Sequence, residues 1–160
     1  MSAVIGILVG LLVLLRVIGR QVTGSLVTQR SLALMPGILM VIGVLTAWPA
    51  LSGASSGEIA FLALDCVVLV GLGLARGTSI RLTQHEEGLW QKGTVATLLL
   101  WLVTIALRVG ATFAAAALWP EGKLSHATLA LTVGLTIAAQ NAVIYRRALD
   151  HHIPFAVERA

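Results

Sequence analysis

The sequence predicts an all-α polytopic membrane protein, a bundle of five transmembrane helices, and three observations support that prediction. Hydrophobic residues make up 58% of the 160-residue chain and charged residues only 11%, well below the roughly 25% charge of a typical soluble domain. The mean hydropathy of +0.94 excludes an intrinsically disordered chain. Five apolar stretches are long enough to cross a hydrocarbon core of about 30 Å, which takes about 20 helical residues.

The predicted spans follow one another with short connections and form a single membrane domain, residues 1–160. They cover approximately residues 3–19, 32–51, 58–75, 94–119 and 124–145. Each is expected to be helical, because lipid offers no water to unpaired backbone amides. The first stretch carries Arg16 and Arg20 after its apolar run, whereas a secretory signal places its charges before it. We therefore expect a retained span there.

Basic residues are distributed unevenly among the connections, and this predicts the orientation. With the N-terminus outside, the cytoplasmic segments hold nine Lys and Arg, and the outer connections hold only Lys123. The nine are Arg16, Arg20, Arg30, Arg76, Arg81, Lys92, Arg146, Arg147 and Arg159. We therefore expect the loop 76–93 and the tail 146–160 to lie in the cytoplasm, near anionic lipid headgroups.

The loop 76–93 is the longest predicted connection. Apolar residues flank the polar turn candidate at residues 85–88, a pattern that fits either a short two-stranded hairpin or an irregular loop. Its basic and aromatic residues, Arg81, Trp90 and Lys92, are candidates for contact with a partner.

Two ionisable residues, Asp65 and Arg108, lie inside predicted spans. Each costs at least about 2.5–3.5 kcal/mol to insert. They lie about 10 Å and about 16 Å from the outer ends of their spans, a difference that an arginine side chain can bridge. Helical side chains lean toward their own N-terminus, however, so these two lean apart on antiparallel helices. The sequence leaves their pairing open.

Polar residues recur along one face of each of the last two spans. The fourth span carries Thr97, Trp101, Thr104, Arg108 and Thr112, and the fifth carries Thr128, Thr132, Thr136, Gln140 and Asn141. We expect the two faces to meet each other or a common interior. They either hold the bundle together through interhelical hydrogen bonds or line a ligand site around Arg108.

Signals for catalysis and for metal or cofactor binding are missing from the sequence. No histidine stands four residues from another metal ligand on a predicted helix, and the single cysteine, Cys66, forms no CxxC pair. The adjacent Glu86 and Glu87 are expected to be solvated. We predict no catalytic residue, metal or cofactor. A net charge of +4 without a dense basic stretch also argues against a nucleic-acid partner.

A series of short motifs resembles a family of bacterial membrane proteins. The motifs are Arg30, Pro36, Gly71-x-Gly73, Gly77-Thr78, Gly88-x-Trp90-x-Lys92-Gly93 and Trp101 through Ala106-Leu107-Arg108. Over roughly residues 10–145 they resemble the CcdC-like family in its actinobacterial form, whose role is largely unassigned. The resemblance implies a bacterial plasma membrane and an accessory role linked to envelope or cytochrome biogenesis. It marks Trp90, Lys92 and Arg108 as positions of interest.

Three functions follow as expectations. The first is a noncatalytic accessory or assembly protein that acts through a membrane-protein partner or as a homo-oligomer. The second is a transporter or ligand-binding component, which holds a lipophilic or anionic ligand in a polar interior around Arg108. The third is an intramembrane enzyme with Asp65 as its acid.

Overall fold

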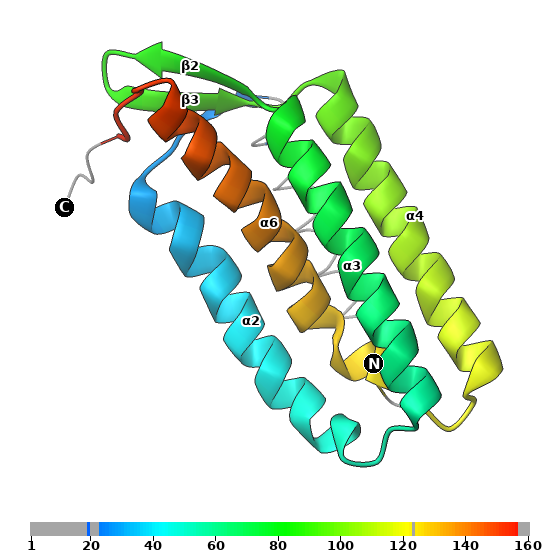
Figure 1. The fold of residues 1–160 in the computed structure, drawn as a ribbon. Helices are drawn as coiled ribbons and strands as arrows, with labels where there is room; N and C mark the ends of the chain where they lie inside the picture. The colour runs from blue at the N-terminus through cyan, green and yellow to red at the C-terminus, as the bar shows by residue number, and fades with distance from the viewer. Residues whose placement is uncertain (1–18, 20–22, 123, 157–160) are drawn as a thin grey trace.

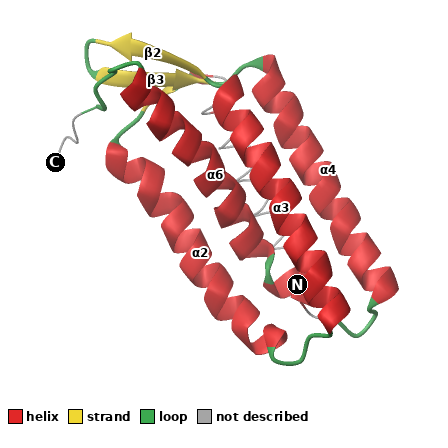
Figure 2. Cartoon of the chain, viewed as in Figure 1, coloured by secondary structure: helices red, strands yellow, loops and turns green. Residues whose placement is uncertain are grey.

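The computed structural model describes residues 19, 23–122 and 124–156 and is mostly helical. Four long helices run alternately in opposite directions, and a small sheet covers one end of the bundle (Figures 1 and 2). We call this the sheet end and the opposite one the distal end. The elements are β1 (Ser25–Leu26), α2 (Gln29–Leu51), α3 (Ser56–Ser79), β2 (Arg81–His85), β3 (Gly88–Lys92), α4 (Val95–Leu118), α5 (Leu124–Ala127) and α6 (Leu129–Asp150).

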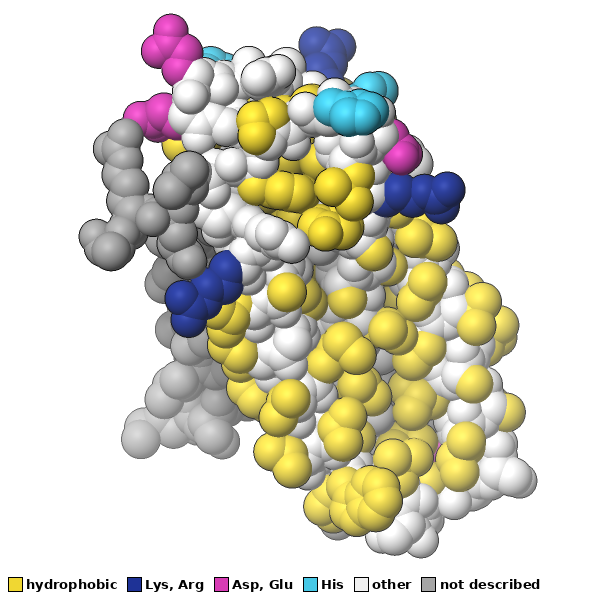
Figure 3. Space-filling view, turned by 60° about the vertical axis from the view of Figure 1, so that its left-hand side comes forward, with side chains coloured by type: hydrophobic (Ala, Val, Ile, Leu, Met, Phe, Trp, Pro, Cys, Tyr) yellow, Lys and Arg dark blue, Asp and Glu magenta, His cyan; other side chains and the backbone are white. Residues whose placement is uncertain are grey.

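Three of the helices, α2, α3 and α4, are long and apolar enough to cross a membrane. Their 23 or 24 residues extend about 35 Å, slightly more than the hydrocarbon core. Large apolar side chains such as Leu45, Val67 and Phe113 are exposed on their outer surfaces. Figure 3 shows apolar side chains covering the face below the sheet end, with charged side chains toward that end. This distribution is that of a membrane protein.

The fourth long helix, α6, lies between α2 and α3 (Figure 1). We predicted one span over approximately 124–145; the helix there is broken at Thr128, and α6 continues to Asp150. The Thr128 hydroxyl donates to the carbonyls of Leu124 and Ser125 at 2.8 and 3.3 Å, a local bond that competes with regular helix geometry. Residues 146–150 are therefore helical and not part of a tail.

The helix at the third predicted span, 58–75, is longer than that span. Helix α3 begins with a capping box, in which Ser55 and Glu58 bond each other's backbone amides. Its C-terminal carbonyls accept bonds from Arg147, which donates to Gly77, Thr78 and Ile80. This cap from α6 extends α3 to Ser79, so residues 76–79 do not belong to the loop. The first predicted span, 3–19, lies outside the described residues except for residue 19.

The sheet forms at the loop we predicted, and the hairpin alternative is confirmed. Strands β2 and β3 pair antiparallel through a turn between His85 and Gly88, and β1 adds a third strand beside β3. The sequence analysis did not predict β1, and the fold is thus not purely helical. A cluster of apolar side chains joins the sheet to the helix ends: Val27, Leu32, Ile80, Leu89, Ile144 and Ala148.

Candidate functional site

An ion pair joins α3 to α4 in the distal half of the bundle. Arg108 Nη1 donates to Asp65 Oδ2 at 2.5 Å, and the two side chains are 12% and 8% exposed. The pairing that the sequence left open is therefore formed. Each charge alone would be costly at this buried position because water cannot hydrate it. The pair offsets that cost, because the two charges neutralise each other.

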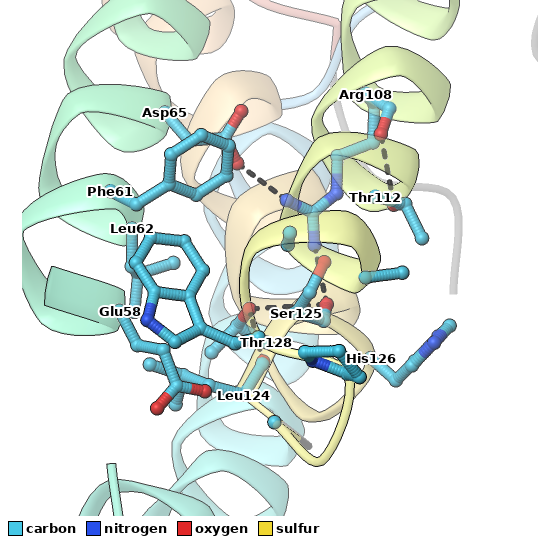
Figure 4. A pocket seen from close by; sticks show the side chains of 15 residues that line it. Glu58, Phe61, Leu62, Asp65, Arg108, Thr112, Leu124, Ser125, His126 and Thr128 are labelled. Carbon is cyan, nitrogen blue, oxygen red and sulfur yellow. Dashed lines mark hydrogen bonds and ion pairs between the residues drawn. The ribbon is translucent and has the colours of Figure 1, made fainter. Parts of the chain in front are cut away.

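The same guanidinium also fixes the short helix α5. Arg108 Nη2 donates to the Ser125 carbonyl at 2.8 Å, so one side chain connects α3, α4 and α5. Figure 4 shows Arg108 and Asp65 directed toward one another, with Ser125 next to the guanidinium. The bond to the Ser125 carbonyl therefore attaches α5 to the ion pair.

A cavity of about 200 Å³ lies beside this ion pair at the distal end. Its walls come from α3, α4, α5 and the connection between α4 and α5 (Figure 4). Two buried polar atoms of lining residues, Arg108 Nε and Ser125 Oγ, have no hydrogen-bond partner in the part of the chain that the structure describes. An unsatisfied buried polar group costs about 1–3 kcal/mol. We call this cavity the distal pocket.

The mouth of the distal pocket combines aromatic rings with a carboxylate. The rings of Phe61 and Trp119 lie 5.8 Å apart at 59°. Glu58 Oε2 accepts bonds from the Ser55 amide and hydroxyl at 2.9 and 3.1 Å. Among the residues described, no cation forms an ion pair with Glu58. The mouth therefore offers negative charge and aromatic faces.

Helix α3 lies between α4 and α6 (Figure 1), so the two predicted polar faces are apart along α6, whereas Arg108 and Thr112 of one face and Thr128 of the other line the distal pocket together. Several hydroxyls return to their own helix: Thr104 bonds Leu100 O, Thr112 bonds Arg108 O, and Thr132 bonds Thr128 O and Leu129 O. Other polar groups do connect elements. Thr97 bonds Ser79, Thr136 bonds Leu69 O, and Asn141 bonds Leu32 O. Part of this polar set therefore holds the helices together, and part only satisfies its own helix.

Between the two predicted polar faces lies an arginine, Arg76, that the sequence analysis assigned to the loop 76–93. Arg76 is fully buried in the last turn of α3. Its Cζ lies 3.9 Å from the ring centroid of Trp101, and Nη2 lies 2.6 Å from Thr136 Oγ1. Arg76 thus connects α4 to α6 through α3.

Arg76 forms no ion pair with any carboxylate of the described chain. Arg76 Nε and Nη1 are buried and have no hydrogen-bond partner among the described residues. The same is true of Trp101 Nε1 and Gln140 Oε1. Sequence analysis missed this residue because it ended the span at residue 75. Gly73 and Gly77 could have indicated the longer helix. They are four residues apart and therefore lie on one helical face, which continues past Arg76.

The three candidate contact residues of the loop lie on one face of the hairpin. Arg81 and Lys92 are opposite each other in the register of β2 and β3, and Trp90 shares their face because side chains alternate along a strand. The Trp90 ring lies 5.2 Å from that of His85. Both cations are exposed, so this face is basic.

The described residues contain no group of three His, Cys, Asp or Glu side chains that could hold a metal ion. Comparison with known protein families, with characterised proteins and with solved structures finds no match to this chain. Fold and site together define a helical membrane protein with a polar pocket at one end.

Proposed function

We propose that this chain is a noncatalytic accessory protein of a bacterial plasma membrane, and that it binds a lipophilic ligand in the distal pocket. The main support is the pair of buried, unpartnered atoms at the pocket, Arg108 Nε and Ser125 Oγ. A ligand oxygen that reached either atom after a small side-chain movement would accept its hydrogen bond and remove its desolvation cost. The apolar remainder of the ligand would contact the surrounding helices.

The proposal includes five spans, with the N-terminus outside and the distal pocket at the outer surface. The charge distribution supports this orientation: Arg81, Lys92, Arg146 and Arg147 lie in elements at the sheet end. Positive loops favour the cytoplasmic side.

The ion pair between Asp65 and Arg108 argues against two other hypotheses, an intramembrane enzyme with Asp65 as its acid and a site for a purely anionic ligand at Arg108. The Asp65 carboxylate is occupied by Arg108 and is not free to face a substrate, which weakens the hypothesis of an intramembrane enzyme. The charge of Arg108 is in turn balanced by Asp65. A purely anionic ligand therefore gains little from it.

A variant whose side chain fills the distal pocket tests the proposal. Ala115 lines the distal pocket, whereas Ala117 is exposed on the same helix and lines none of the described cavities. Protein purified in mild detergent should retain about one lipophilic molecule per chain, measured by native mass spectrometry. Ala115→Leu should lose it, because the added side chain occupies the cavity, and the matched variant Ala117→Leu should keep it. A wild-type protein without any bound molecule would overturn the proposal.

A second candidate function is contact with a partner protein through the basic hairpin face. Like charges directly opposite each other on a sheet repel, so Arg81 and Lys92 favour an acidic partner surface. The resemblance to CcdC-like proteins suggests a partner in envelope or cytochrome biogenesis, and a second copy of the chain is the alternative. An Arg81→Gln/Lys92→Gln variant should lose a stoichiometric co-purifying protein while it retains the ligand. Co-purification that is unchanged in this variant would exclude the hairpin face.

A further inference from the structure

We propose that the ligand of the distal pocket is a phospholipid whose headgroup carries a primary amine, with one acyl chain in a groove between α3 and α4. This inference rests on the proposed function and names the chemical class of its ligand. Three features of the structure support it: a groove continuous with the pocket, the charges at the mouth and the donors at the floor.

The groove is a cavity of about 320 Å³ between α3 and α4, and it shares Phe61 and Asp65 with the distal pocket. It extends toward the middle of the bundle, since Val68 lies ten residues beyond Glu58, about 15 Å along α3. The other lining residues are apolar: Leu64, Ala106, Leu107, Gly110, Ala111 and Ala114.

The groove is open to the surroundings of the protein. Leu64 is 62% exposed and Leu107 is 45% exposed, and a Cβ added at Gly110 would meet nothing within 4 Å. Small residues on α4 leave a depression there that no described side chain fills. An apolar channel that faces the bilayer and leads into a polar pocket fits an amphiphile, with its chain in the channel and its headgroup in the pocket.

The mouth of the pocket selects a cation. Glu58 has no ion-pair partner among the described residues, and Phe61 and Trp119 present aromatic faces beside it. Aromatic faces attract ammonium groups, and a carboxylate gains most from a cation that also donates a hydrogen bond. A primary ammonium meets both conditions.

The floor of the pocket selects an oxygen acceptor. Arg108 Nε carries one N–H, and Ser125 Oγ carries one O–H; neither has a described partner. A phosphate or ester oxygen that reached either atom after a small side-chain movement would accept its hydrogen bond. The lining holds two carboxylates, Glu58 and Asp65, together with one guanidinium and the imidazole of His126, and the carboxylates disfavour a headgroup with only negative charge. A zwitterionic headgroup with its amine toward Glu58 matches both ends.

A lipid competition experiment tests this inference. Full-length protein is incubated with an equimolar mixture of phosphatidylethanolamine and phosphatidylglycerol with identical chains, and bound lipid is counted by native mass spectrometry. Wild-type protein should retain phosphatidylethanolamine about fivefold over phosphatidylglycerol, the effect of one partly shielded ion pair. Glu58→Gln should bind both equally and still fold, because Gln also completes a capping box.

Two further variants separate the parts of the inference. Ser125→Ala removes a hydroxyl that makes no described hydrogen bond, so it should leave stability unchanged and lower retention of both lipids about threefold. Glu121→Gln, an exposed carboxylate that does not line the distal pocket, should keep the wild-type preference.

The outcomes distinguish the two proposals. Bound lipid without preference in the wild type, or a preference that persists in Glu58→Gln, would overturn the amine headgroup while the proposed function stands. Retention of neither lipid nor any other lipophilic molecule would overturn both.

Discussion

Two buried arginines on neighbouring helices are accommodated in different ways. Arg108 lies near the middle of α4 and is neutralised by Asp65. Arg76 lies in the last turn of α3, where its guanidinium contacts the Trp101 ring and Thr136 and forms no ion pair with a described residue. The negative end of the helix dipole favours a cation in the last turn, and an aromatic face adds to this. The comparison teaches that a cation in mid-helix needs a carboxylate, whereas one at a helix C-terminus is held without it.

The largest expected effect follows from breaking the ion pair. Arg108→Gln leaves Asp65 as an unpaired buried charge, so the free energy of unfolding should fall by about 3–5 kcal/mol. Unfolding of the purified protein in mixed detergent micelles, followed by circular dichroism, measures this. The double variant Asp65→Asn/Arg108→Gln should recover part of the loss, because no charge remains. A double variant as unstable as the sum of the singles would mean that the pair contributes nothing.

A smaller effect should come from the packing that brings Arg76 to Thr136. A Cβ at Gly73 would lie 2.4 Å from the Thr136 carbonyl oxygen, so Gly73→Ala must push α3 away from α6. We expect a loss of about 1–3 kcal/mol in the same unfolding measurement. Gly71→Ala is the matched control, because a Cβ there meets nothing within 4 Å. Equal losses in both variants would contradict the close approach of the two helices.

The smallest effect is expected for Arg76→Met, which replaces the unbalanced cation by an apolar side chain of similar length. The variant loses a charge-assisted hydrogen bond worth about 1.5–3 kcal/mol, but it also removes a desolvation cost of several kcal/mol. Stability should therefore change by about 1 kcal/mol or less, or increase. A loss as large as that of Arg108→Gln would show that Arg76 is balanced by an anion, and the contrast between the two arginines would disappear.

The elements that depend on local pattern were predictable. Apolar runs of helical length located α2, α3 and α4, and the polar turn between Leu82 and Leu89 left a hairpin as one of two alternatives. Asp65 and Arg108 were identified because charge inside an apolar run is costly wherever the run packs. The pairing itself was not predictable, because it depends on the rotation and offset of α3 against α4, which spacing along one helix does not define.

Arg76 shows the limit most directly. Because Arg76 is charged and follows an apolar run, the sequence pattern places it in a loop. In the structure, Arg147 from α6 caps the carbonyls that follow Arg76, and α3 continues past this residue. The strand β1 was missed for a similar reason, since two residues beside Gly24 have no periodicity to detect and pair only because β3 is already in place.

By itself, the sequence determined that this is an apolar helical chain with an asymmetric charge distribution and two costly charges in its interior, because solvation acts on each residue individually. Only the tertiary structure decided which charge is paired, which arginine is buried, and where a pocket with unpartnered donors lies. These properties depend on the relative positions of side chains from helices far apart in the chain, and packing alone sets those positions.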